Sequence, residues 1–206
     1  LIAVAEQTKN TLIQEGADEE DIAVVNLGVR EKFEIRKDYS SREDKIGYLG
    51  DFRPRKRVGR LLEEFNNSDS GYELLIGGTG GSEQEKLKKR YSGSNRIEFQ
   101  GRIPEDDLVD WYNSLKAFIF PTELEGFGLP VLEATACGTP VFVYEDANIS
   151  EEVKEFCVEV NNVQEIEGKL DGFKDAELEG KSEEVKRKFD WDKTVEETIS
   201  VYNESA

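Results

Sequence analysis

The stretch PTELEGFGLPVLEATACG, Pro121–Gly138, lies between two short apolar runs, Ala117–Phe120 and Val141–Tyr144. Short apolar runs rich in aromatic and β-branched side chains predict buried strands. A Gly-Phe-Gly turn followed by Leu-Pro predicts a helix over Leu129–Ala136, because proline suits the first turn of a helix. The stretch therefore predicts a strand–loop–helix–strand unit, from which parallel sheets are built.

The same alternation of strand and helix continues on both sides of this unit. Further strands are predicted at Ile46–Leu49, Tyr72–Ile76, Ile97–Gln100 and Cys157–Val160. Further helices are predicted at Arg57–Phe65, Glu83–Tyr91, Leu108–Leu115 and Ser150–Phe156, and residues 163–205 form a polar, helical remainder. We therefore predict an α/β fold with a Rossmann-like parallel sheet and helices on both of its faces.

Four loops that follow predicted strands should meet at one edge of this sheet. These loops are Gly50–Lys56, Gly77–Gly81, Gly101–Ile103 and Thr122–Gly128. Open parallel sheets bind ligands beyond the carboxyl ends of their strands. We therefore expect a binding site where the four loops converge.

The composition excludes several classes of function. The 206 residues include 45 acidic and 27 basic side chains, and the net charge of −18 argues against a nucleic-acid partner. The absence of histidine excludes histidine-based triads and histidine-ligated metal sites, and we predict no metal. The two cysteines, Cys137 and Cys157, are expected to be free and buried. No run could span a bilayer, and with no export signal we expect a cytoplasmic location.

Two glutamates flank the turn in the first stretch, Glu125 before it and Glu133 inside the predicted helix. Glycines such as Gly126 and Gly128 let backbone N–H groups approach an anion closely at the start of a helix. Carboxylates accept hydrogen bonds from hydroxyls, and a phosphate together with hydroxyls describes a sugar nucleotide. The spacing alone also fits a capped helix with two surface glutamates, because glutamate is abundant throughout the chain.

The full string resembles the signature of retaining GT-B glycosyltransferases, the glycosyl transferases group 1 family. The residues that carry the resemblance are EGFGLP at 125–130, Glu133-Ala134, and CGTPV at 137–141. The similarity extends over nearly the whole chain. It implies the C-terminal half of a GT-B fold, which binds the nucleoside-diphosphate sugar that donates its sugar.

The resemblance implies a role for each part of the string. Glu125 would contact the hydroxyls of the donor sugar, and Glu133 would accept hydrogen bonds from the ribose. The donor-binding turn between them consists of Gly126, Phe127, Gly128 and Leu129, with backbone amides that hold the sugar and the diphosphate. A lysine six positions after a loop glycine would neutralise the leaving diphosphate, and here Lys56 follows Gly50 at that spacing.

The basic loop departs from the family at one position. The family often has an arginine directly after the glycine, whereas this chain has Asp51. Either Arg53 or Arg55 is a candidate to replace that arginine, and a solvated basic loop is the alternative for both.

Two further loops have weaker signals. The family places a Gly-x-Gly near the diphosphate, which Gly78 and Gly80 match, and a backbone segment near the nucleobase, which Arg102 and Ile103 match. Purely structural turns remain an alternative for both loops. The Gly-rich loop is not the G-x-G-x-x-G of a dinucleotide fold.

The resemblance also implies a division of the chain. Residues 1–34 would be the last strand–helix–strand of a missing N-terminal domain together with the hinge, and the polar residues Val29–Asp44 predict a linker. Residues 35–189 would bind the donor, and residues 190–206 would form a C-terminal helix that returns toward the N-terminal domain. Acceptor contacts, and any contact with the inner membrane face, would then come only from the missing domain.

The expected activity is that of a hexosyltransferase. It would transfer a sugar from a UDP-, GDP- or ADP-sugar to a hydroxyl of a glycan, a lipid or a small molecule, with retention of configuration and no cofactor. We expect the chain to be inactive without its N-terminal domain. The alternatives are a non-catalytic nucleotide-sugar-binding or regulatory module, an NAD-dependent dehydrogenase, and a glycosidase with paired carboxylates.

Overall fold

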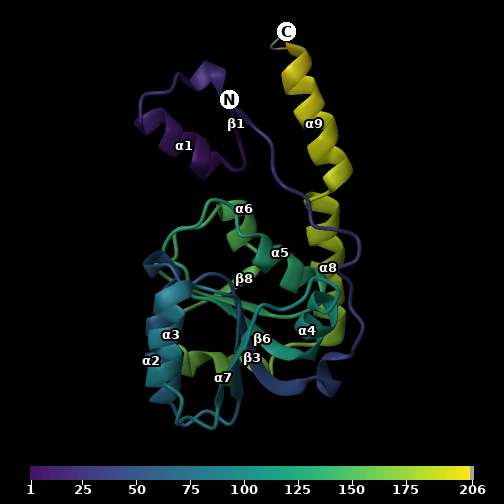
Figure 1. The fold of residues 1–206 in the computed structure, drawn as a ribbon. Coiled ribbons are helices and arrows are strands. Elements are labelled where there is room, and N and C mark those ends of the chain that lie inside the picture. Colours follow the sequence, from purple (N-terminus) through teal and green to yellow (C-terminus); the bar gives the residue numbers. More distant parts are fainter. Residues whose placement is uncertain (205–206) are drawn as a thin grey trace.

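The computed structural model describes residues 1–204 and centres on a six-stranded parallel sheet (Figure 1). The strands are β3 (Glu43–Leu49), β4 (Glu73–Gly77), β5 (Ile97–Gly101), β6 (Leu115–Phe120), β7 (Val141–Tyr144) and β8 (Cys157–Val160). Their order across the sheet is β5-β4-β3-β6-β7-β8, and every neighbouring pair is parallel. The predicted fold class is confirmed.

Helices cover both faces of the sheet (Figure 1). One face carries α2 (Val58–Asn66), α3 (Gly81–Arg90) and α7 (Gln164–Leu170), and the other carries α4 (Leu108–Ser114), α5 (Leu129–Ala136), α6 (Glu151–Lys154) and α8 (Asp175–Lys188). Successive side chains of a strand point to opposite faces. On β6, Phe118 and Phe120 therefore pack on the face covered by α4, α5, α6 and α8. Ala117 and Ile119 pack on the face covered by α2, α3 and α7.

The strand order reverses between β3 and β6. From β3 the chain adds β4 and β5 on one side, and it then crosses back to lay β6, β7 and β8 on the other side. The loops after β3 and β6 therefore diverge from adjacent strands. Such a switch point leaves a crevice at the carboxyl edge of a parallel sheet, where ligands bind.

The first 24 residues form a separate small unit. Its strands β1 (Ile2–Ala3) and β2 (Ala23–Val24) pair in parallel with each other and not with the large sheet. Between them lies α1 (Glu6–Gln14), which has no buried residue. Figure 1 places this unit at the same end of the molecule as the second half of α9 (Trp191–Glu204).

The predicted polar linker after Val29 is in fact packed against the main domain. Three of its side chains are buried against that domain, those of Val29, Phe33 and Tyr39. Arg42 is also buried, and its guanidinium donates to the Cys137 carbonyl (2.8 Å) and to the Thr139 hydroxyl. Charged residues dominate the composition of this segment and hide its apolar anchors. The linker therefore holds a fixed course along α4 and the edge of the core.

Two segments run between the small unit and the main domain, and they contact each other. The Val29 N–H donates to the Phe189 carbonyl (2.8 Å), and the Thr194 hydroxyl donates to the Asn26 carbonyl (2.7 Å). A Cβ added to Gly28 would lie 2.4 Å from the Trp191 nitrogen, so only glycine permits this close approach. The start of α9 is thereby fixed to the hinge segment.

The structure also bears on the two cysteines and on the expected lack of a membrane-spanning segment. Both cysteines are free, as expected, and Cys137 is buried, but Cys157 is only half-buried because β8 is the edge strand of the sheet. No helix within residues 1–204 is long and apolar enough to cross a membrane.

Candidate functional site

Three loops at the carboxyl edge of the sheet are joined by backbone hydrogen bonds. The Glu123 N–H donates to the Arg55 carbonyl (2.7 Å), which ties the loop after β6 to the loop after β3. The Asn148 N–H donates to the Glu123 carbonyl (2.8 Å), and the Glu125 N–H donates to the Asn148 carbonyl (3.0 Å). These bonds add the loop after β7. The side chains of the three loops are therefore held in a fixed arrangement.

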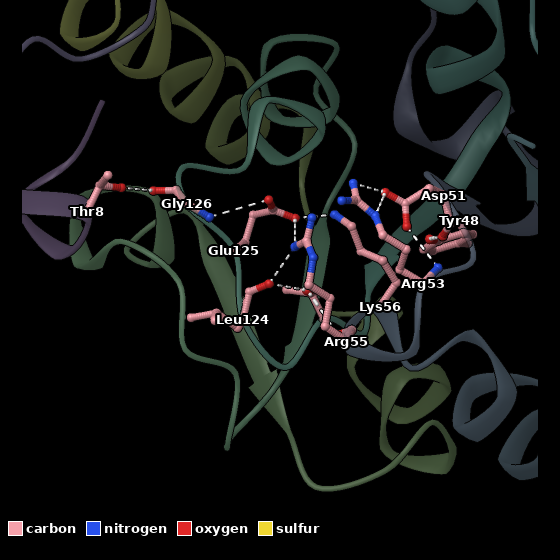
Figure 2. Close-up of polar contacts among 10 residues, drawn as sticks. Thr8, Tyr48, Asp51, Arg53, Arg55, Lys56, Leu124, Glu125 and Gly126 are labelled. Atoms are coloured by element: carbon pink, nitrogen blue, oxygen red, sulfur yellow. Dashed lines mark hydrogen bonds and ion pairs between the residues drawn. The ribbon is translucent and has the colours of Figure 1, made fainter. Parts of the chain in front are cut away.

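Lys56 and Glu125 meet at the centre of this arrangement (Figure 2). The Lys56 ammonium and Arg55 Nη1 (3.2 Å) both donate to Oε2 of Glu125, and the Gly126 N–H donates to its Oε1 (3.3 Å). The Lys56 side chain is only 8% exposed, and its ammonium lies 4.9 Å from the centre of the Phe120 ring. The site therefore holds two cations on one carboxylate, where a bound anion would be poorly screened by water.

The two candidate arginines contact different carboxylates (Figure 2). Arg53 donates to Oδ2 of Asp51 through Nε (2.9 Å) and Nη2 (2.5 Å), and its side chain is 67% exposed. This pair lowers the pKa of Asp51, chiefly through the hydrogen bonds from Arg53. Arg55 instead donates to the Leu124 carbonyl (2.7 Å) and to Glu125. Of the two, Arg55 contacts Glu125, whereas Arg53 forms its ion pair with Asp51.

The helix that carries Glu133 begins at the predicted turn. Gly128 has a φ of 108° and precedes the first residue of α5, and no side chain caps this helix. A left-handed residue at this point favours glycine. Phe127 is buried with its ring 5.6 Å from that of Phe189, which anchors the turn to the end of α8. Because α5 follows β6 through this turn, its N-terminus lies at the carboxyl edge of the sheet, four residues after Glu125 in the sequence.

Glu133 lies on α5, and its side chain is about as exposed as that of Glu125 (14% against 17%), but its neighbours differ. The Tyr112 hydroxyl donates to its Oε2 (3.1 Å), and Nη2 of Arg30 lies 3.9 Å from its Oε1. Burial raises the pKa of Glu133, and Tyr112, Arg30 and Lys32 oppose that rise. Burial and the neighbouring carboxylate also raise the pKa of Tyr112 well above its usual value, so its phenol remains a donor.

This geometry can be set beside known proteins. The model of the family described as glycosyl transferases group 1 matches residues 30–189. The chain belongs to this family. O-antigen chain mannosyltransferase B of Escherichia coli is 28% identical over an alignment of 170 residues, and the match covers 75% of this chain and 44% of that protein. D-inositol 3-phosphate glycosyltransferase of Streptomyces bingchenggensis is 31% identical over an alignment of 170 residues, and the match covers 70% of this chain and 37% of that protein. The chain thus spans less than half of either relative.

Solved structures share the fold over nearly the whole chain. HepE of Anabaena in complex with UDP has a TM-score of 0.76 at 18% identity, covering 97% of this chain and 63% of that one. Sucrose-phosphate synthase from Thermosynechococcus elongatus has a TM-score of 0.76 at 20% identity, covering 98% of this chain and 57% of that one. At these identities the likeness concerns the fold alone.

The predicted Gly-rich loop has a structural reason for its glycines in this family member. A Cβ on Gly78, whose φ is 113°, would lie 1.8 Å from the Gly50 carbonyl oxygen, and a Cβ on Gly80 would lie 2.4 Å from Phe52. The Gly80 N–H already donates to Oε1 of Gln84 (3.0 Å). Gly78 and Gly80 therefore let the loops after β3 and β4 pack together, and Gln84 occupies one of their amides.

The predicted base-binding pair lies at the end of β5. Arg102 is exposed, and Ile103 is partly buried beside the Gly77 backbone. The loop after β5 reaches the loop after β4, since the Gly78 N–H donates to the Gly101 carbonyl (2.6 Å). Among residues 1–204 there is no group of three or more acidic, histidine or cysteine side chains arranged to hold a metal ion.

Sequence reasoning missed Arg30, Tyr112 and Thr8. Arg30 contacts Glu133, Tyr112 donates to it, and the Thr8 hydroxyl donates to the Gly126 carbonyl (3.3 Å) from α1. All three lie far from the motif in the sequence, and no local pattern marks them. Only the packing of the linker, α4 and the small unit against the site brings them there.

Proposed function

We propose that this chain is the donor-binding part of a retaining glycosyltransferase, the C-terminal half of a GT-B fold that binds a nucleoside-diphosphate sugar. The observation that carries the proposal is the contact of Lys56 and Arg55 with Glu125 beside the N-terminus of α5. This arrangement brings together two cations, the backbone amides at the start of a helix, and a carboxylate that can accept hydrogen bonds from sugar hydroxyls. All three lie at the switch point of the parallel sheet. Family membership and the UDP complex of HepE support the same class of ligand.

The diphosphate would bind at the cationic end. Lys56 and Arg55 would exchange the Glu125 carboxylate for phosphate oxygens, and the amides at the start of α5 would face the same group. Glu125 would then be free to accept hydrogen bonds from the donor sugar. The cations thus hold Glu125 in place before the donor arrives and stabilise the diphosphate afterwards.

The ribose would bind at Glu133. Tyr112 engages Oε2 of this carboxylate, and the remaining lone pairs can accept hydrogen bonds from two ribose hydroxyls. Glu133 is 14% exposed, so such bonds would form in a site with little competing water. The nucleobase would lie near Arg102 and Ile103.

The transfer step would proceed with retention of configuration. The bond between the anomeric carbon and the diphosphate oxygen breaks, and its electron pair remains on the diphosphate. Lys56, Arg55 and the α5 amides stabilise that developing charge. The acceptor hydroxyl attacks the same face of the oxocarbenium-like sugar, and its proton passes to the leaving phosphate. Because the phosphate takes the proton, this step requires no histidine base.

The acceptor and its binding site belong to this proposal as well. The chain spans 44% and 37% of the two relatives described above, so the rest of a longer protein would supply the acceptor contacts. Residues 1–34, which include the small unit, would be the end of that domain and the hinge, and α9 would return to it. The exposed side chains of Val195, Ile199 and Tyr202 on α9 fit such a contact.

Calorimetric titration with UDP, GDP and ADP tests the binding function in this chain. We expect one of the three, hereafter the preferred diphosphate, to bind, and Glu133→Ala to weaken that binding. Weakened nucleotide binding in Glu133→Ala would also exclude a glycosidase with Glu125 and Glu133 as paired carboxylates. Failure of the folded chain to bind any of the three would contradict the proposal.

A further inference from the structure

Arg30 reaches the proposed ribose site from a segment that the motif does not include. Its Nη2 lies 3.9 Å from Oε1 of Glu133, and its Nη1 donates to Oε1 of Glu105. Lys32 donates to the same Glu105 carboxylate (3.2 Å) and to the Glu105 carbonyl (3.1 Å). Arg30 is thus the side chain that links a solvent-facing ion cluster to the buried carboxylate.

The backbone around Arg30 is fixed on both sides. The Val29 N–H donates to the Phe189 carbonyl (2.8 Å), and the Phe33 N–H donates to the Arg30 carbonyl (3.0 Å). The Phe33 ring is fully buried and packs edge-on against Tyr112, with ring centres 6.1 Å apart. The Arg30 guanidinium lies 5.5 Å from the centre of the Phe33 ring. The aromatic pair therefore sets the guanidinium and the Tyr112 hydroxyl on the same carboxylate.

Titratable groups act on Glu133 from four parts of the chain. The linker contributes Arg30 and Lys32, the segment before α4 contributes Glu105, α4 contributes the neutral Tyr112, and α5 itself contributes the neutral Cys137. Burial opposes ionisation of Glu133, as does the negative charge of Glu105. Arg30 and Lys32 act in the opposite sense. Arg30 alone combines contact with Glu133 and neutralisation of Glu105.

We propose that Arg30 is a positioning residue for nucleotide binding, which keeps the Glu133 carboxylate ionised and oriented so that it accepts hydrogen bonds from the donor ribose. This inference rests on the proposed function. Arg30 is on the segment between the small unit and the main domain, two residues after the hinge glycine Gly28. Recognition of the ribose is thereby tied to the course of that segment.

The sign of the pH dependence follows from the charges. A protonated Glu133 has one acceptor oxygen fewer, so preference for a ribose over a 2′-deoxyribose should fall as the pH falls through the raised pKa of this carboxyl. Removal of Arg30 takes away a cation that opposes the rise. The loss of preference should then begin at a higher pH than in the wild type.

The test compares the affinity for the preferred diphosphate with that for its 2′-deoxy counterpart, because the titration of the phosphates cancels in this ratio. Titrations of the whole 206-residue chain would run from about pH 5 to about pH 8. Near pH 5, the ratio of the affinity for the diphosphate to that for its 2′-deoxy counterpart should be about two- to fivefold lower in Arg30→Gln than in the wild type, the range for a half-exposed ion pair. Arg30→Lys should restore most of the wild-type ratio.

Arg36→Gln is the matched control. Arg36 lies on the same segment, is 42% exposed against 43% for Arg30, and pairs with Asp110 and Glu34 rather than with Glu133. Its pH profile should equal that of the wild type. An Arg30→Gln profile equal to the wild type, or an Arg36→Gln profile shifted as far, would overturn the role of Arg30. A wild type that binds no diphosphate would instead overturn the proposed function.

Discussion

Glu125 and Glu133 are eight residues apart, and the fold gives them opposite surroundings. Glu125 lies on a loop and receives direct hydrogen bonds from Lys56 and Arg55. Glu133 lies on a helix against the neutral hydroxyl of Tyr112, with a guanidinium at 3.9 Å and a raised pKa. Glu125 is thus engaged directly by two cations, whereas the hydrogen bond to Glu133 comes from a neutral hydroxyl.

The difference predicts separable defects at the two ends of the site. Substitutions at the Glu125 end should change recognition of the diphosphate and the sugar. Substitutions at the Glu133 end should change recognition of the ribose. Each variant below either separates the two ends further or shows that they act as one.

The largest effect is expected from Lys56→Met. This substitution removes a charge-assisted hydrogen bond, worth about 1.5–3 kcal/mol, so the affinity for the preferred diphosphate should fall roughly 10- to 100-fold. Affinity for the nucleoside without phosphates should remain unchanged in calorimetry. Lys45→Met is the control, because Lys45 forms its ion pair with Glu43 at the opposite end of β3. Equal losses for nucleoside and diphosphate would contradict a phosphate role.

Glu133→Gln should have the next largest effect. The amide keeps one acceptor oxygen but loses the charge, so affinity for the preferred diphosphate should fall about tenfold, or ~1.4 kcal/mol. The affinity for the 2′-deoxy counterpart should fall by a smaller factor. The measurement is therefore the ratio of the two affinities, which should be smaller in Glu133→Gln than in the wild type. An unchanged preference for the ribose form would place the ribose elsewhere.

Arg55→Ala should lower the affinity for the preferred diphosphate about threefold to tenfold. The effect should be smaller than that of Lys56→Met because the Arg55 side chain is more exposed. Arg53→Ala is the matched variant on the same loop. Because Arg53 is 67% exposed and pairs with Asp51 rather than with Glu125, the affinity of Arg53→Ala should stay within about twofold of the wild type. A reversed order of the two variants would show that Arg53, not Arg55, replaces the family arginine.

Thr8→Val should have the smallest effect. It removes one neutral hydrogen bond to the Gly126 carbonyl, worth about 0.5–1 kcal/mol, and leaves Glu133 untouched. Affinity for the nucleoside-diphosphate sugar should change by less than about fivefold, and affinity for the nucleoside should not change. A loss of nucleoside affinity would mean that the small unit acts on the ribose end.

The fold was predictable because its signals are local. Short apolar runs such as Val141–Tyr144 are buried strands, and the turn at Gly126–Gly128 opens α5 as predicted. The polar composition after Val29 hid a packed segment, since three buried aromatic or aliphatic anchors suffice to hold it. Segment 163–205 is predicted to be helical and polar, and its described residues form the helices α7, α8 and α9, while residue 205 lies outside the described residues.

The candidate site was predictable only in part. The motif identifies Glu125, Glu133 and Lys56, because these residues stand at fixed spacings from glycines. It could not choose between Arg53 and Arg55, since that choice depends on the contact between Asp51 and Arg53. Arg30 and Tyr112 depend on tertiary packing alone, which a single sequence does not encode in any local pattern.

The most direct measurement is the affinity of Lys56→Met for the preferred diphosphate and for its 2′-deoxy counterpart, at a pH where Glu133 is ionised. Separate roles for the two ends predict that both affinities fall by the same factor, so that the preference for the ribose form stays at its wild-type value. Distant sites without shared partners are expected to act additively in this way. Loss of that preference in Lys56→Met would contradict the division of the site between Glu125 and Glu133.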